Sequence, residues 1–177
     1  TGLNSKTDRM LSIGAVTVVG NEISIDSSLE VLIEQEQFNK DSVAIHGILK
    51  HGKYRKLTEI EALKSCLEFI GTSIIVGHHI GFDVSMINQA LKRHGLGKLK
   101  NKTLDTALLY RRLIHPVNRS LHETSYSLDE LAEALKIPLH DRHTAAGDAF
   151  ITALAFIKIV HNLNSDGKLK VKHLFRR

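Results

Sequence analysis

Side chains that could do chemistry together occur in two short segments, residues 76–83 and 143–149. In the first, Asp83 stands where an apolar run is expected to lead into a helix, and open α/β sheets bind their ligands at this kind of edge. In the second, His143 precedes an expected helix and Asp148 lies in its first turns. A carboxylate can bind a cation or exchange a proton, and an imidazole exchanges protons near neutral pH.

The spacing of His143 and Asp148 restricts how the two side chains can share a site. Residues five apart on one helix point in different directions, so both can face one site only if His143 lies in the loop before the helix. The residues around them are small (Ala145, Ala146 and Gly147). They leave this helix end open to close approach by another backbone or by a ligand.

Each of these residues also has a purely structural interpretation. A lone aspartate at a helix start is most often an N-cap, and this applies to Asp83. A lone histidine is usually a satisfied surface or core residue. Asp148 is harder to explain in this way, because its helix is otherwise apolar and a buried carboxylate needs a partner.

The elements that must position these residues begin with a strand pair. Residues 10–19 are rich in β-branched side chains, and the turn at Gly20-Asn21 predicts that residues 22–33 form an antiparallel partner. A break is expected in the second strand at Ser27-Ser28. Residues 73–76 form a short apolar run, which is typical of a strand covered on both faces.

Helices are expected to follow the strands. Thr58 and Ser127 each stand three residues before a glutamate, which predicts a capping box at two helix starts. Other helices are expected at residues 41–49 (a short one), 82–94, within 103–113 after a short strand or loop, and 144–160. The alternation of strands and helices predicts one α/β domain over residues 1–177, with a mixed sheet flanked by helices.

The composition favours a polyanionic partner. The 177 residues are 42% hydrophobic, enough for one large core, and carry a formal net charge of +5 with a pI of about 9.4. A basic protein attracts nucleic acid, and the positive charge here is concentrated in residues 92–102 and 168–177. Two solvated faces, or a frayed C-terminal end, would explain the same charges.

Other features indicate a soluble cytoplasmic domain without membrane contact. The single cysteine, Cys66, excludes an intrachain disulfide and lies in an apolar helical pattern, which predicts a buried thiol. The longest apolar stretches, such as residues 11–19 and 73–76, are far too short to cross a bilayer. No signal-peptide pattern opens the chain.

Taken together, in their order and setting, the segments resemble the DnaQ-like (DEDDh) family of 3′→5′ exonucleases. One block of that family resembles His-Asn-x-x-Phe-Asp and is matched by residues 78–83, with His79 in place of the asparagine. Another block, His-x-Ala-x-x-Asp-Ala, is matched in full by residues 143–149. Softer matches at residues 45–48, 104–106 and 126–131 extend the likeness over nearly the whole chain. The resemblance implies an RNase H-like mixed β-sheet flanked by helices.

The sequence departs from the family at its beginning. The family's first block, Asp-x-Glu-Thr-Thr-Gly, ends the central strand, and only its tail is matched, by Thr1-Gly2-Leu3. A sheet without its central strand would form two halves with unpaired edges. We therefore expect an Asp-x-Glu segment to precede Thr1 in the natural protein, or else a real loss of activity.

The resemblance also implies a reaction, namely hydrolysis of the terminal phosphodiester bond at a 3′ end with release of nucleoside monophosphates. Asp83 and Asp148 would bind two Mg²⁺ or Mn²⁺ ions ~3.5–4 Å apart, and His143 would act as general base. Single-stranded DNA is the favoured substrate, and a DNA polymerase is a candidate partner. Five residues match family positions near the 3′ nucleotide: Leu3, His46, Ile48, His79 and Phe82.

Alternatives to this assignment stay open. The chain could be a nucleic-acid-binding module that keeps the exonuclease fold without catalysis, and an upstream Asp-x-Glu would decide between the two. Alternatively, a transition-metal site could form from His78, His79, His140, Asp141 and His143, in which case zinc would bind tightly. Core packing explains Phe82 equally well, and Asp105 is expected to cap a helix rather than bind a metal.

Overall fold

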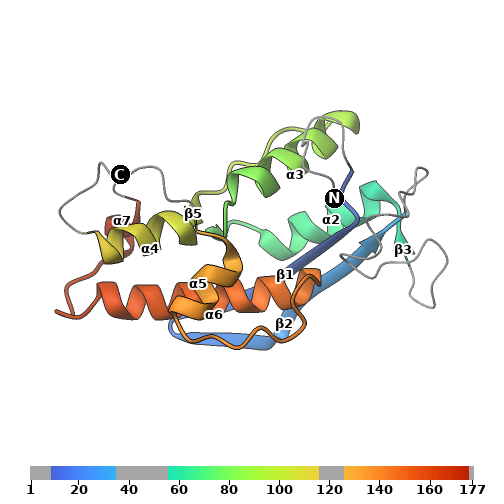
Figure 1. The fold of residues 1–177 in the computed structure, drawn as a ribbon. Coiled ribbons are helices and arrows are strands. Elements are labelled where there is room, and N and C mark those ends of the chain that lie inside the picture. Colours follow the sequence, from blue (N-terminus) through green and yellow to red (C-terminus); the bar gives the residue numbers. More distant parts are fainter. Residues whose placement is uncertain (1–8, 35–55, 116–125, 176–177) are drawn as a thin grey trace.

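A computed structural model describes residues 9–34, 56–115 and 126–175 (Figure 1). Its larger sheet has the strand order β1-β2-β3, formed by β1 (Ser12–Val19), β2 (Glu22–Ile33) and β3 (Lys56–Leu57). β1 and β2 are the predicted antiparallel hairpin, with Gly20 in the turn at a φ of 61°. β3 adds to β2 in parallel and was not expected from the sequence.

The predicted break in the second strand is a β-bulge. β2 continues as one strand, but the register shifts between Val16, which pairs with Ser28, and Thr17, which pairs with Ser24. The residues between those partners bulge out, and Ile25 is 75% exposed as a result.

A second sheet has two parallel strands, β4 (Ile75–Gly77) and β5 (Thr103–Asp105). Over the described ranges, β1 pairs only with β2, and β4 pairs only with β5. β1 and β4 both pack against the same helix, α6 (Ala145–Leu163). The described residues thus form two separate sheets that share a covering helix.

The remaining helices are α2 (Glu59–Ile70), α3 (Gly81–Arg93), α4 (Thr106–Ile114), α5 (Leu128–Ala134) and α7 (Val171–Leu174). Both predicted capping boxes are confirmed, with Thr58 and Glu61 at the start of α2 and Ser127 and Glu130 at the start of α5. The short helix expected at residues 41–49 lies outside the described residues.

Two apolar clusters form the core. One gathers residues of α4, α5 and α6, including Leu131 and Ile159, and the other joins the first sheet to α2 and α3. Cys66 lies in the second cluster and is 2% exposed, as predicted. Burial raises the pKa of its thiol to about 11, so the thiol stays protonated at neutral pH.

The expectation about apolar length was wrong for α6. This helix has 19 residues and a mean hydropathy of 1.3, enough by length and composition to cross a membrane. Its side chains at Ile151, Ala155 and Ile159 are buried in the core beside α4 and α5. The apolar character is thus explained by the place of α6 between the helices and both sheets.

Candidate active site

The N-terminus of α6 carries Asp148 and is held in place by close backbone contacts. Gly14 of β1 lies so near that an added Cβ would collide with the backbone of Ala145 and lie 2.6 Å from the nitrogen of Ala146. Gly147 meets the preceding loop in the same way, at the carbonyl of Asp141. The small residues predicted to permit close approach therefore do so, and the approaching backbone is that of β1.

His143 lies in the loop before α6, as its spacing from Asp148 predicted. Its backbone φ is 71°, in the left-handed region, and Thr144 follows as the N-cap, accepting a hydrogen bond from the Gly147 amide. The amide of His143 donates to Oδ1 of Asp148 at 3.1 Å. The two residues are thus neighbours, joined through the backbone of one and the side chain of the other.

Arg142 binds two carboxylates at once. Its Nη1 donates to both oxygens of Asp148, at 2.7 and 2.8 Å, while its Nε and Nη2 donate to the two oxygens of Asp129 at 2.6 and 3.3 Å. The arginine side chain is only 19% exposed. Its guanidinium holds the pKa of Asp129 below the usual range. Asp148 thus has the partner that its place in an apolar helix required.

Asp83 is not the helix cap that the structural interpretation suggested. α3 begins at Gly81, so Asp83 lies within its first turn, and the N-cap position belongs to Ile80, which makes no side-chain cap. Asp83 is an exposed residue, but packing around its carboxyl removes enough hydration to raise its pKa to about 6, and the negative charge of Asp105 acts in the same direction. The N-cap interpretation is wrong, and a carboxyl with a perturbed pKa remains to be explained.

Asp83→Asn is expected to stabilise the metal-free protein at pH 8. The folded protein holds the Asp83 proton with a pKa of about 6, above the model value of 3.8, so the unfolding free energy falls as the pH rises between these values. Asparagine carries no charge, so the variant avoids this fall in the unfolding free energy. Thermal melting in EDTA should show a gain at about pH 8 and little change at about pH 4.

Asp129→Asn is the matched control, because the pKa of Asp129 is lowered rather than raised. Its carboxylate contributes stability that is present above its unfolded pKa and lost as the pH falls through its folded pKa. This variant should therefore lose stability at about pH 8. Equal gains from the two variants would refute the assigned environment of Asp83.

Two histidines connect the end of β4 to the start of α5. His78 lies 3.0 Å through Nδ1 from the Thr106 hydroxyl and 2.7 Å through Nε2 from the Tyr126 carbonyl. The carbonyl only accepts, so Nε2 carries the proton. Burial lowers the pKa of His78, and a neutral ring then accepts from Thr106 at Nδ1. His78 is a structural bridge.

The residues matched to the 3′ nucleotide are only partly described. His79 is exposed, with a φ of 55°, and its Nε2 lies 3.1 Å from the same Tyr126 carbonyl. Phe82 is half-buried and packs against the core cluster that contains α2 and α3, consistent with its structural interpretation. Leu3, His46 and Ile48 lie outside the described residues.

Asp105 caps α4, as predicted. Its Oδ1 accepts from the Ala107 amide at 2.9 Å and from the His79 amide at 3.2 Å. The cap therefore ties the β4–α3 connection to the end of β5. This contact explains why the charge of Asp105 is felt at Asp83.

Charges connect the surroundings of Asp83 and Asp148. Burial lowers the pKa of His78 and the positive charge of Arg142 acts in the same direction, whereas the negative charge of Asp105, which raises the pKa of Asp83, opposes it. Arg142 is bonded to Asp148. The end of β4 and the start of α6 thus lie within electrostatic range of each other.

Sequence reasoning missed Arg142 and its second partner, Asp129. One signal was available, because Arg142 is the only lysine or arginine among residues 137–150 and directly precedes His143. Asp129 could not be found in this way, since the chain folds it into contact from α5.

The carboxylates fit hard divalent cations such as Mg²⁺ or Mn²⁺, which prefer oxygen ligands. The negative charge of Asp105 raises the cost of ionising Asp83, and a cation beside Asp83 would relieve this cost. In the portion of the chain that the structure describes, no group of three or more His, Cys, Asp or Glu side chains is placed to hold a metal ion. These carboxylates are suitable ligands for such cations, but a complete metal site needs further donors.

Arg142→Gln is expected to destabilise the metal-free protein and to increase its stabilisation by Mn²⁺. The change leaves Asp129 and Asp148 without their shared cation, for a cost of ~1 kcal/mol or roughly 2–4 °C in Tm. A cation at Asp148 would then no longer compete with the guanidinium. Arg9→Gln is the control. It also removes one arginine paired with a carboxylate, but that carboxylate, Glu59, keeps Arg93 and His94 as partners. A smaller Mn²⁺-induced shift in Arg142→Gln than in the parent would contradict the competition.

The fold and these residues define a nuclease domain of the RNase H-like class. The chain belongs to the RNase T exonuclease family, whose sequence profile matches residues 1–156. A solved structure described as Exonuclease X in complex with 5′ overhanging duplex DNA shares the fold, with a TM-score of 0.66 and 20% identity over 93% of this chain and 88% of that one. The predicted family and fold class are confirmed.

The chain is also similar to DNA polymerase III proteins of bacteria. The chain is 33% identical over 175 residues to the PolC-type DNA polymerase III of Caldanaerobacter subterraneus subsp. tengcongensis, an alignment that covers 98% of this chain and 12% of the relative. It is 30% identical over 164 residues to DNA polymerase III subunit epsilon of Aquifex aeolicus, covering 92% and 77% of the two chains. The chain thus spans about a tenth of the length of the PolC-type relatives.

Proposed function

We propose that this protein is a metal-dependent 3′→5′ exonuclease that removes nucleoside monophosphates from single-stranded DNA ends. The observation that carries the proposal is the start of α6, where His143 and Asp148 are neighbours in a chain of the exonuclease family. Asp83, with its raised pKa beside Asp105, would complete the carboxylate pair. The charge effects that reach from Arg142 to His78 support one shared site.

Each residue has a distinct role in this proposal. Asp83 and Asp148 hold divalent cations, which supply positive charge to the attacking and leaving oxygens. His143 accepts the proton of the attacking water from its position in the loop before α6, where its Nδ1 lies 3.3 Å from Nη1 of Arg142. His79 and Phe82, with Leu3 and His46, contact the terminal nucleotide. Arg142 balances the charge of Asp148 before cations bind.

We also propose the extent of the domain, its protein partner and its location in the cell. Residues 1–177 would act as one domain, and a strand ending in Asp-x-Glu before Thr1 would supply the family's first block. The relatives named DNA polymerase III components make a polymerase the proposed protein partner, in the cytoplasm. The second candidate function is non-catalytic nucleic-acid binding, favoured by the basic charge and by the scarcity of clustered metal donors in the described residues.

The test uses an extended form of the chain in which a strand ending in Asp-x-Glu precedes Thr1. This form is incubated with a 5′-labelled single-stranded oligonucleotide in Mg²⁺, Mn²⁺ or EDTA. The proposal predicts a ladder that shortens from the 3′ end, and only with a metal present. An inactive extended form that still binds the oligonucleotide would support the non-catalytic alternative.

A further inference from the structure

The C-terminal basic segment folds back onto the body of the protein instead of fraying. Leu174 is 8% exposed and joins the core cluster of α4, α5 and α6, while Leu169 and Phe175 pack partly against the same cluster. Nη1 of Arg112 in α4 donates to the carbonyl of Leu174 at 3.1 Å. The backbone at Leu174, near the end of the described part of this segment, is therefore held against α4.

The second basic segment meets the first at the same place. The Nζ atom of Lys102 lies 5.5 Å from the centre of the Phe175 ring, in a cation–π contact. Lys102 immediately precedes β5, and Phe175 immediately follows α7. The two basic clusters, which lie far apart in the sequence, thus form one surface.

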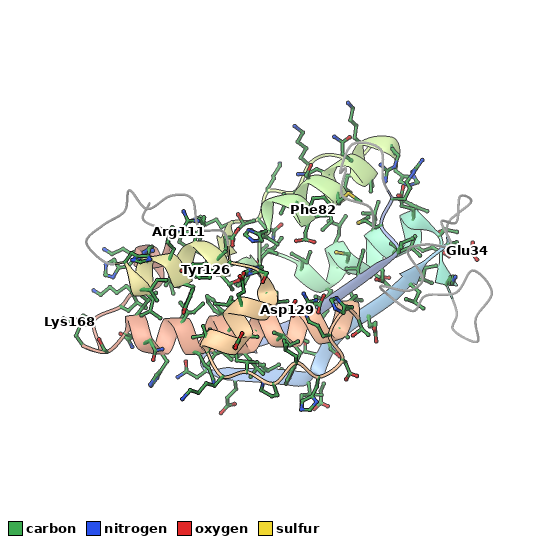
Figure 2. All side chains as sticks on the ribbon, viewed as in Figure 1. Glu34, Phe82, Arg111, Tyr126, Asp129 and Lys168 are labelled. Carbon is green, nitrogen blue, oxygen red and sulfur yellow. The ribbon has the colours of Figure 1, made fainter. Side chains whose placement is uncertain are left out.

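We call this surface the α4–α7 basic face. Figure 2 shows two of its members, Arg111 and Lys168, toward the end of the molecule where α4 and α6 finish. The face consists of cations from three segments: Lys100, Lys102, Arg111, Arg112, Lys168, Lys170 and Lys172.

Little within the described residues neutralises this face. Across residues 98–115 and 164–175, the carboxylate side chains are Asp105, at the opposite end of α4, and Asp166, whose Oδ1 accepts from the Lys168 amide at 3.1 Å. Lys100, Lys168 and Lys172 are exposed and form no ion pair with any described residue. The face therefore presents concentrated positive charge to solvent.

The face is separate from the candidate active site. α4 starts directly after Asp105 and has nine residues, which gives it a length of ~13 Å. Lys102 is three residues before Asp105 along β5, or ~10 Å away in an extended strand.

We propose that the α4–α7 basic face is a second nucleic-acid contact, which binds backbone phosphates of the strand away from the hydrolysed bond. This inference rests on the proposed function, because it places the 3′ end at Asp83 and Asp148. Lysines at spaced, solvated positions fit a chain of repeating phosphates, and such contacts add affinity without base preference. The face holds the body of the substrate while its end is in the active site.

The experiment measures binding of the 177-residue chain to fluorescent single strands of about 4 and about 16 nucleotides in EDTA, as a function of salt. The test variant is Lys100→Ala with Lys172→Ala, which removes one exposed cation from each basic segment. The control is Lys64→Glu, an exposed position on α2 that gives the same change in net charge. Thermal melting confirms that all forms are folded.

With the long strand, the double variant should reduce the slope of log affinity against log salt by roughly 1.4, or 0.7 for each lost phosphate contact. The control should retain nearly the full slope, and the short strand should not distinguish the double variant from the control. Equal slopes for the double variant and the control on the long strand would overturn the proposal. They would leave the face to an acidic protein partner.

Failure of the proposed function is a distinct result. It would appear as an extended form that leaves the short strand intact in Mg²⁺, whatever the salt slopes show. The other combination is an extended form that shortens the strand, with equal salt slopes for the double variant and the control. This result would refute the second contact and leave the proposed function standing.

Discussion

Asp148→Asn is expected to lower the exonuclease rate of the extended form by at least roughly 10²–10⁴, the range for loss of a positioned catalytic group. Asparagine keeps the shape of the side chain and an oxygen that can accept from the His143 amide. It removes the negative charge that would hold a divalent cation. The measurement is single-turnover release of the terminal nucleotide in saturating Mg²⁺.

Asp129→Asn is the matched control for this prediction. Asp129 shares Arg142 with Asp148, and its loss changes the net charge equally. Because Asp129 has no part in binding the cations, the exonuclease rate of Asp129→Asn should differ from that of the parent by no more than about twofold, or ~0.5 kcal/mol. Equal losses in the two variants would mean that the Arg142 contacts matter, and that Asp148 is no metal ligand.

His143→Ala is expected to slow the same reaction by roughly 10²–10⁴, the usual contribution of a general base. The amide of residue 143 still donates to Asp148, so the backbone contact survives the change. A structural defect would slow the reaction at every pH. Loss of a base should instead be partly rescued as hydroxide replaces it at high pH.

The rescue is measured from pH–rate profiles of the parent, His143→Ala and His140→Ala. His140 is an exposed histidine three residues earlier in the chain, and its replacement should leave the profile unchanged. A His143→Ala profile parallel to that of the parent would exclude the role of general base, however slow the variant is.

Local sequence signals predicted the parts of the fold that depend on few residues. Thr58 and Ser127 each reach a glutamate three residues away, so their capping boxes form without help from distant segments. The position of His143 before α6 followed from helix geometry alone. The small residues at this helix start were explained once β1 was found against them.

Contacts between distant segments accounted for most of what the sequence did not predict. Arg142 joins Asp148 to Asp129, and the latter is brought to it by the packing of α5 on α6. α7 has four residues and no periodic pattern, and its Leu174 becomes buried only against α4, α5 and α6. The environment of Asp83 depends on Asp105, which lies 22 positions away in the chain and belongs to β5.

The most direct test of the shared site is a crystal structure of the extended form with Mn²⁺ and a short single strand, with the metal located by anomalous scattering. The account predicts Mn²⁺ at ~2.0–2.3 Å from carboxylate oxygens of both Asp83 and Asp148, with a second ion ~3.5–4 Å from the first. The His143 ring should face the water nearest the terminal phosphate. Mn²⁺ bound away from these carboxylates, or Asp83 and Asp148 on opposite sides of the domain, would contradict it.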